Sequence, residues 1–209
     1  MNGNEILSGG TGMGGVVVLG ANWQSVVELF RHCKNVNEKL VIQTAVSVRA
    51  ISGNVLLIEH DSQNHLYVYK HAYPPGWCSV LAGIYRGIFA SHVYEGWKRT
   101  GNGKCILCFV QPHPYWESVV KKLSPHHIIY YCVDDYREMR PDRKDKIEQY
   151  ERKIVDVSSL VICTSKYMTD NFKERFNKSG EKIVHIPNGT YSEYIVPKVL
   201  KKPETLPSD

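Results

Sequence analysis

The segment from Ile128 to Ser165 constrains the fold of this chain more than any other. Ile128–Val133 is a short apolar and aromatic run, Asp142–Ser158 has the spacing of an amphipathic helix, and Leu160–Cys163 is a second short apolar run. A strand, a helix and a strand in this order predict a βαβ unit with two parallel strands.

The polar residues that follow these two strands are the first candidates for a functional site. Asp134 and Asp135 come directly after the first strand, and Thr164 and Ser165 come after the second. In an open parallel sheet, ligands bind at the carboxyl ends of the strands. We therefore expect these side chains at one edge of the sheet.

Size and composition indicate one globular α/β core. The chain has 209 residues, of which 43% are hydrophobic and 22% are charged. The net charge of +5 suits phosphate-bearing small molecules or an anionic membrane surface, but the basic residues are dispersed, which disfavours nucleic acid as a partner. The sequence shows no amino-terminal apolar segment of the secretory type and no apolar run of the ~18 residues that span a membrane. We expect a cytoplasmic protein, with peripheral contact at the inner membrane face left open.

Glycine and proline positions suggest three segments. Residues 1–15 are expected to be a flexible glycine-rich leader, residues 16–196 one Rossmann-like domain, and residues 197–209 a linker-like tail. Residues 10–15 match the pattern GxGxxG, but they precede the first strand, Val16–Leu19, instead of following it. This misplacement disfavours a dinucleotide-dependent oxidoreductase, although tight binding of NAD would revive that function.

The remaining pattern predicts a doubly wound, mostly parallel sheet with helices on both faces. A Ser25-x-x-Glu28 capping box opens the first helix, and a second helix is expected over Asn37–Ile51. His60 and Asp61 follow the next strand and are expected at the same edge as Asp134. The other predicted strands are Val55–Ile58, Leu66–Tyr69, Lys104–Val110 and Lys182–Ile186, and the other predicted helices begin near Ser79, Trp116 and Ser165, the last with Ser165 as its cap.

The six cysteines give little support to redox or metal chemistry. Cys105 and Cys108 form a lone CxxC pair, but they lie in a strand pattern that directs the two thiols to opposite faces. Core packing is the favoured interpretation, and zinc or redox chemistry is the alternative.

Further candidates occupy the turns that follow the other strands. Asn22 and Trp23 follow the first strand, His113 stands between two prolines after the strand that ends at Val110, and Asn188 and Gly189 follow the last strand. An aromatic ring at such a turn is either a platform for a ligand or a lid on the core. An imidazole there is either structural or a group that transfers protons.

Three blocks in this order resemble the amino-terminal half of GT-B glycosyltransferases, in particular those of bacterial polysaccharide and cell-wall synthesis. The blocks are YYCVDDYREMRP, ERKIVDVSSLVICTSKYM and VHIPNGTYSEY, and the resemblance covers about residues 16 to 196. The family usually continues Pro-Asn-Gly with Val-Asp, whereas this chain has Thr190 and Tyr191. The family's second domain, which binds the nucleotide sugar, would begin after Asp209.

The resemblance implies an acceptor-binding domain for a sugar acceptor, either a glycan or a lipid-linked glycan. It implies a nucleotide sugar as substrate, no metal ion or cofactor, and a donor-binding domain in the same or another chain. Asp135, Asp134 and His113 are the expected proton acceptors, with Asp135 preferred because Asp134 is expected to cap the next helix. The residues expected to shape the cleft between acceptor and donor are Asn22, Trp23, Ser165, Asn188 and Gly189.

Another class of function fits the same pattern. A lone Rossmann-like domain could hold a ligand or a partner chain without catalysing a reaction. Such a binding module would bind a small ligand unaided, whereas the acceptor domain of an enzyme would present an open, partly apolar edge to its donor domain.

Overall fold

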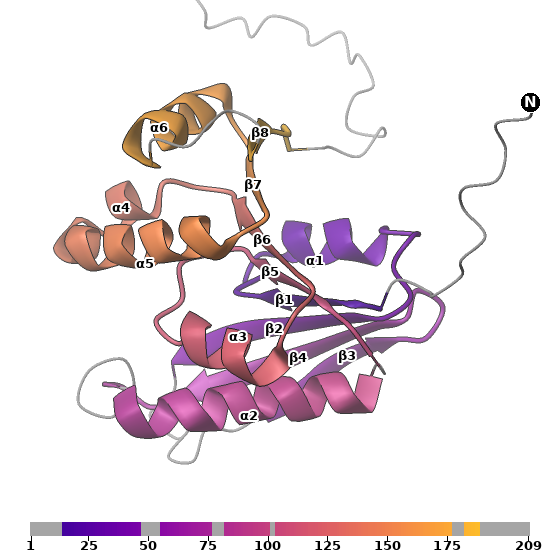
Figure 1. Cartoon of the computed structure of the whole chain (residues 1–209). Coiled ribbons are helices and arrows are strands. Elements are labelled where there is room, and N and C mark those ends of the chain that lie inside the picture. Colours follow the sequence, from indigo (N-terminus) through magenta and orange to yellow (C-terminus); the bar gives the residue numbers. More distant parts are fainter. Residues whose placement is uncertain (1–13, 47–54, 77–81, 101–102, 177–181, 189–209) are drawn as a thin grey trace, which may run out of the picture.

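A computed structural model describes residues 14–46, 55–76, 82–100, 103–176 and 182–188. In this part of the chain, the strands form one sheet with helices on both faces (Figure 1). The strands are β1 (Val16–Leu19), β2 (Lys39–Val46), β3 (Val55–Asp61), β4 (Leu66–Tyr73), β5 (Ile106–Phe109), β6 (His127–Cys132), β7 (Leu160–Cys163) and β8 (Ile183–His185). The helices are α1 (Gln24–Arg31), α2 (Ala82–Thr100), α3 (Trp116–Leu123), α4 (Tyr136–Met139), the 3-10 turn η1 (Pro141–Arg143), α5 (Lys144–Val157) and α6 (Lys166–Phe176).

The sheet confirms the predicted fold class. Its strand order is β3-β4-β2-β1-β5-β6-β7-β8, and every neighbouring pair is parallel except β3 with β4. The first strand, β1, lies at the centre with β2 beside it. The chain then reaches the outermost strand, β3, and returns as β4 between β3 and β2. From β4 it crosses over through α2 and builds the other half from β5 to β8. The parallel strands all end at one edge, which we call the carboxyl edge. The direction of winding reverses between β1 and β5, the kind of point at which such sheets bind ligands.

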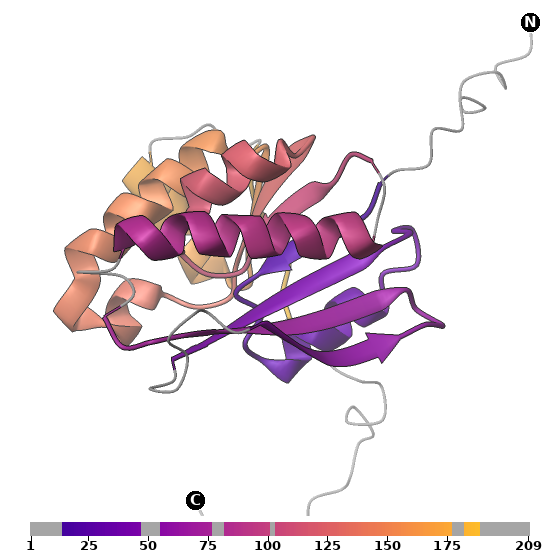
Figure 2. The same ribbon diagram turned by 90° about the horizontal axis from the view of Figure 1, so that it is seen from below.

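Apolar side chains form two layers of unequal size, one on each face of the sheet. Figure 2 shows the long helix α2, in magenta, lying across one of these faces. Val17 and Leu19 point to the larger layer, which packs beneath α2, α3, α5 and α6. Val16 and Val18 point to the smaller layer, beneath α1. This alternation follows from the two-residue period of a strand, and it explains why β1 is apolar throughout, as parallel strands buried on both faces usually are.

The helix predicted over Asn37–Ile51 is wrong where the structure describes it, because Lys39–Val46 is strand β2. The strand pairs with β1 on one side and with β4 on the other. Leu40 packs in the larger layer and Val41 in the smaller one. A short run buried on both faces has no clear period of two, so its apolar positions can imitate helical spacing.

The positions expected for His60 and Asp61 are also wrong. Both residues belong to β3, which runs antiparallel to its neighbour, and Asp61 pairs with Leu66 at the start of β4. They therefore lie toward the edge opposite the carboxyl edge. There the Asp61 carboxylate accepts a hydrogen bond of 2.6 Å from the Arg31 guanidinium at the end of α1, so it ties a helix to the sheet.

The last two residues of the predicted leader are packed against the sheet, and residues 1–13 lie outside the described residues. The Gly15 carbonyl oxygen accepts a hydrogen bond of 3.0 Å from the Ile106 amide, at the start of β5. A Cβ on Gly15 would lie 2.0 Å from the Glu38 carbonyl oxygen. This glycine therefore permits close backbone approach, as packing between two strands requires.

The CxxC cysteines behave as predicted. Cys105 is buried in the larger layer and Cys108 in the smaller one, and both are free thiols. Burial raises the pKa of Cys105 to about 11 and that of Cys108 to about 12. Thiols held in the protonated form on opposite faces of a sheet pack as small apolar groups.

A buried ion pair joins α5 to α6. One Glu151 carboxylate oxygen accepts a hydrogen bond of 2.9 Å from Arg175, and the other accepts one of 3.0 Å from the Tyr130 hydroxyl. The Glu151 side chain is 1% exposed and that of Arg175 is 11% exposed. Burial raises the pKa of Glu151, while Arg175 and Tyr130 act in the opposite direction. The carboxylate depends on these partners because it is withdrawn from water.

We predict that Arg175→Met lowers the free energy of unfolding by about 3 kcal/mol, because it leaves a buried carboxylate without its cation. The double variant Arg175→Met/Glu151→Met should lose at least ~1 kcal/mol less than the sum of the two single variants. Urea titrations followed by circular dichroism measure both quantities.

The matched control is Lys153→Met, which removes an exposed cation 3.4 Å from Glu117. It should change the free energy of unfolding by less than ~0.5 kcal/mol. A loss below ~1 kcal/mol in Arg175→Met would show that the pair does not hold α5 to α6.

Candidate functional site

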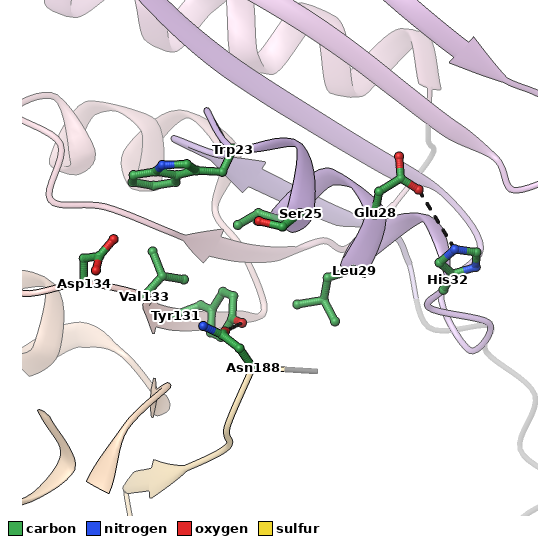
Figure 3. A pocket seen from close by; sticks show the side chains of 10 residues that line it. Trp23, Ser25, Glu28, Leu29, His32, Tyr131, Val133, Asp134 and Asn188 are labelled. Atoms are coloured by element: carbon green, nitrogen blue, oxygen red, sulfur yellow. Dashed lines mark hydrogen bonds and ion pairs between the residues drawn. The ribbon is translucent and has the colours of Figure 1, made fainter. Parts of the chain in front are cut away.

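An open pocket of about 440 Å³ lies at the carboxyl edge, between α1 and the segments that follow β6 and β8 (Figure 3). One wall comes from α1 and the other from β6 and the chain beyond β8. The side chains that line it are Trp23, Ser25, Val26, Glu28, Leu29, His32, Tyr131, Val133, Asp134 and Asn188.

The α1 wall is one face of a helix. Ser25, Leu29 and His32 recur at intervals of four and three residues, so they lie above one another along the pocket. Gly20 has a φ of +82°, which turns the chain sharply after β1, and Trp23 then takes the N-cap position without a side-chain capping bond. The predicted capping box at Ser25 is wrong, because Ser25 is already the second residue of α1. Its hydroxyl group lines the pocket instead.

The opposite wall comes from alternate residues of β6 and the chain after it. Tyr131 and Val133 are two residues apart and share the α1 side of the sheet, where both pack with the smaller apolar layer. The Tyr131 hydroxyl donates a hydrogen bond of 3.2 Å to the Asn188 side-chain carbonyl oxygen. This bond fixes the segment after β8 against β6, although the two are far apart in sequence.

The capping role that we expected of Asp134 belongs to its neighbour, Asp135. Asp135, and not Asp134, caps the following helix: its carboxylate accepts a hydrogen bond of 3.1 Å from the Arg137 amide at the start of α4. Asp134 is exposed and lines the pocket. Our reason for preferring Asp135 as the proton acceptor is therefore wrong, and of the two carboxylates only that of Asp134 lines the pocket.

Asp135 belongs to an ion network that leads away from the pocket. The Arg137 guanidinium lies 3.1 Å from the Asp135 carboxylate and 3.4 Å from that of Glu148, which in turn lies 3.5 Å from Arg175. Burial tends to raise the pKa of Asp135, but the hydrogen bonds from Arg137 outweigh it and leave this pKa below its usual value. A carboxylate stabilised in its charged form by an arginine is a weak proton acceptor.

Glu28 brings a second carboxylate to the pocket. Its oxygens accept hydrogen bonds of 2.7 Å from Gln24 and 2.9 Å from Arg31, and one of them lies 4.0 Å from His32 Nε2 (Figure 3). The bond from Arg31 lowers the pKa of Glu28. Glu28 is therefore a fixed negative charge, and it was not among the residues predicted for the site.

Two other predicted residues lie at the carboxyl edge but outside the pocket. The Asn22 side chain ties the turn after β1 to the end of β2, since its carbonyl oxygen accepts a hydrogen bond of 2.8 Å from the Thr44 amide. The Ser165 hydroxyl accepts a hydrogen bond of 3.2 Å from the Met168 amide, as predicted for the cap of α6. Gly189 lies outside the described residues. Among the residues expected to shape the cleft, Trp23 and Asn188 line the pocket.

His113 is buried in the larger apolar layer and does not line the pocket. Its side chain is 2% exposed, its ring stacks on Phe89 with centroids 4.6 Å apart, and its Nδ1 accepts a hydrogen bond of 3.1 Å from the Tyr115 amide. Burial, with a smaller contribution from nearby His71, lowers the pKa of His113 to about 3. The imidazole is therefore held neutral.

Two further histidines, His71 and His92, stand on the same side of the sheet. His71 of β4 lies with its Nε2 2.9 Å from His92 Nδ1, and its ring meets Phe89 edge-on. Burial, together with His92, lowers the pKa of His71 to about 4, and burial lowers that of His92. The α2 side of the sheet thus holds three imidazoles in their neutral forms.

The described residues contain no group of three or more histidine, cysteine, aspartate or glutamate side chains placed to hold a metal ion. None of the helices described is both long and apolar enough to cross a bilayer.

Comparison with known proteins gives a likeness of fold. No protein-family model matches the sequence, and no curated protein matches it. Among solved structures, E. coli trehalose-6-phosphate synthase bound with UDP-2-fluoro glucose matches with a TM-score of 0.54 at 9% identity, over 86% of this chain and 50% of that one. HepE of Anabaena in complex with UDP-glucose matches with a TM-score of 0.49 at 13% identity, over 85% of this chain and 44% of that one. The α,α-trehalose-phosphate synthase of Burkholderia vietnamiensis matches with a TM-score of 0.49 at 8% identity, over 87% of this chain and 49% of that one.

The likeness to the E. coli protein shows a Rossmann-like fold that matches about half of a GT-B structure. The chain spans about half the length of the proteins that it matches.

The buried histidines predict a loss of stability in mild acid. The unfolded chain binds protons at an imidazole pKa of about 6.5, whereas folded His71 and His113 bind them only near 4 and 3. The unfolded state therefore holds more protons between these values, so the free energy of unfolding should fall as the pH decreases from about 6.5 to 4, by roughly 3 kcal/mol or more in total.

Urea titrations at several pH values measure this dependence. His113→Asn keeps an acceptor for the Tyr115 amide and removes one titrating group, so it should flatten the dependence. The same replacement at the exposed His126 is the matched control. A slope in His113→Asn as steep as that of the parent protein would contradict the account.

Proposed function

We propose that this chain is the acceptor-binding domain of a nucleotide-sugar-dependent glycosyltransferase that works in polysaccharide or cell-envelope glycan synthesis. The observation that carries the proposal is the pocket at the carboxyl edge, where an aromatic platform, Trp23, stands opposite an exposed carboxylate, Asp134. The likeness of fold supports it, since the E. coli protein of this fold is bound with UDP-2-fluoro glucose.

In this proposal, Asp134 accepts the proton of the acceptor hydroxyl group. The acceptor oxygen forms a bond to the anomeric carbon of the donor sugar, the bond from that carbon to the diphosphate oxygen breaks, and the nucleoside diphosphate leaves. Loss of the proton makes the oxygen a stronger nucleophile, and a carboxylate at the edge of the cleft can take it. Trp23 and Tyr131 offer ring faces on which the C–H surface of a sugar can pack.

Asp135 and His113 would act on this reaction only through the structure around it. Asp135 caps α4 directly after the pocket, and His113 supports the turn after β5 through its bond to Tyr115. We propose them as positioning residues, with Asp134 as the residue that contacts the acceptor.

The proposed partner is a donor-binding domain, in the same or another chain, that closes over the carboxyl edge. We propose no metal ion for the reaction, because helix N-termini and basic side chains of a donor domain can stabilise the leaving diphosphate. Five large apolar side chains on different segments that flank this edge are 49% or more exposed: Val46, Ile84, Met139, Tyr167 and Ile186. Such exposure is typical of a surface that another domain covers.

Transfer assays with the chain joined to, or mixed with, a GT-B donor domain test the proposal. With a labelled UDP-sugar and a panel of glycan acceptors, Asp134→Ala should lower kcat by roughly 100-fold or more, as expected for loss of a proton acceptor. Trp23→Ala should raise the KM for the acceptor. Asp170→Ala, which removes an exposed carboxylate on α6, is the matched control and should stay within about twofold of the parent.

Full transfer activity in Asp134→Ala would remove this residue from the mechanism. Saccharide binding without transfer by any combination of the two domains would favour the alternative, a non-catalytic binding module.

We also propose that the domain contacts an anionic membrane surface through basic side chains at the ends of α2 and α3. This surface, the α2–α3 basic patch, comprises Lys98, Arg99, Lys104, Lys121 and Lys122. Lys98 and Lys122 both lie over the Tyr94 ring, with their Nζ atoms 5.6 and 5.4 Å from its centroid. In the described part of the chain, no carboxylate forms an ion pair with any of the five cations. Clustered basic residues are attracted to anionic lipids by about 1 kcal/mol each.

Sedimentation with phosphatidylglycerol vesicles should show binding that weakens as salt is added. Lys98→Glu/Lys122→Glu should lower the bound fraction at least fivefold, while Lys34→Glu/Lys166→Glu, the same charge change outside the patch, should lower it far less. Equal losses in the two double variants would contradict a localised patch.

A further inference from the structure

The charge of the pocket carries a further inference about the acceptor. Glu28 on α1 and Asp134 after β6 place one acidic residue in each of the two walls. No lysine or arginine occurs among the described residues that line the pocket. The one basic side chain of the lining, His32, stands 4.0 Å from the Glu28 carboxylate.

The arginine next to the pocket cannot serve as an anion site. The guanidinium of Arg31 donates to Glu28 at 2.9 Å and to Asp61 at 2.6 Å, and it also pairs with Glu59. All three of its nitrogens are thus engaged with carboxylates, and its side chain is only 16% exposed. Its charge is already balanced by three negative groups.

The positive charge at the N-terminus of α1 is too small to balance the two carboxylates. A helix N-terminus carries the equivalent of about half a positive charge, whereas the two carboxylates bring a full negative charge each. A phosphate group in this pocket would therefore meet net repulsion, and it would lack the bidentate arginine that phosphate sites commonly use.

Hydroxyl groups suit the same lining. Carboxylate oxygens only accept hydrogen bonds, so Asp134 favours ligands that donate them. The Glu28 oxygens already accept hydrogen bonds from Gln24 and Arg31, so Glu28 contributes negative charge to the lining. Ser25 can donate as well as accept, and the Asn188 amide can donate while its oxygen is held by Tyr131. The Trp23 and Tyr131 rings add apolar surface for the C–H face of a sugar ring.

We infer that the acceptor group bound in this pocket is an uncharged saccharide, and that sugar phosphates and uronic acids are excluded by charge. This inference rests on the proposed function, because it takes the pocket to be the acceptor site. The preference for uncharged over anionic acceptors does not follow from the fold, because it comes from Glu28 and Asp134 of this chain.

Ligand titration of the chain tests the inference. The probes are the methyl glycosides of glucose, galactose, mannose and N-acetylglucosamine, each against the 6-phosphate of the same sugar, with glucuronic acid as a second anion. The readout is the NMR signal of the Trp23 indole N–H, assigned with Trp23→Phe. At least one neutral glycoside should bind saturably, and its 6-phosphate should bind about tenfold more weakly at low salt.

A charge-neutral variant tests the cause. Asp134→Asn keeps the shape of the side chain and removes one negative charge, so the preference for the neutral glycoside over its phosphate should fall severalfold. Asp170→Asn, on α6 outside the pocket, should leave the preference unchanged, and circular dichroism confirms that both variants are folded.

The outcomes separate the two proposals. Tighter binding of the phosphates, or an unchanged preference in Asp134→Asn, would overturn the inference and leave the acceptor pocket in place. If neither neutral nor anionic sugars perturb the Trp23 signal, both the inference and the proposed function fail.

Discussion

The parallel pairing of β1 with both β2 and β5 is the constraint on which the rest of the structure depends. Because β1 lies at the centre and the winding reverses beside it, the turns after β1, β6 and β8 reach the same edge from separate parts of the sequence. The apolar layers on the two faces hold this pairing, and α1 is the one described helix on the pocket side. The pocket exists because α1 covers only part of that face.

Ion pairs made by two arginines hold the segments that form the walls of the pocket in place. Arg31 fastens the end of α1 to β3 through Glu59 and Asp61, and Arg137 holds Asp135 at the start of α4. Arg31 also pairs with Glu28 of the pocket lining, whereas Arg137 pairs with Asp135, which does not line the pocket. Asp134 is therefore left exposed at the edge while its neighbour is neutralised, which separates a structural carboxylate from a candidate catalytic one at adjacent positions.

Much of this fold follows from the sequence, and the failures have identifiable causes. The βαβ unit, the cap at Ser165 and the opposite faces of Cys105 and Cys108 depend on local patterns, and the structure confirms them. Strand β2 was missed because burial on both faces removes the alternation that marks a strand. The antiparallel direction of β3, which places Asp61 at the opposite edge, depends on pairing that no local pattern encodes.

At the site, Trp23, Asp134 and Asn188 could be found as residues at strand ends. Glu28 lies in α1 and His32 directly after it, and only their helical spacing could have indicated them.

In the proposed function, the space between α1 and β6 holds the acceptor sugar. A crystal structure of the chain soaked with a neutral glycan tests this placement most directly. We expect a sugar ring packed on Trp23, with a hydroxyl group within hydrogen-bond distance of the Asp134 carboxylate. A glycan bound elsewhere on the molecule, with this pocket filled by water alone, would contradict it.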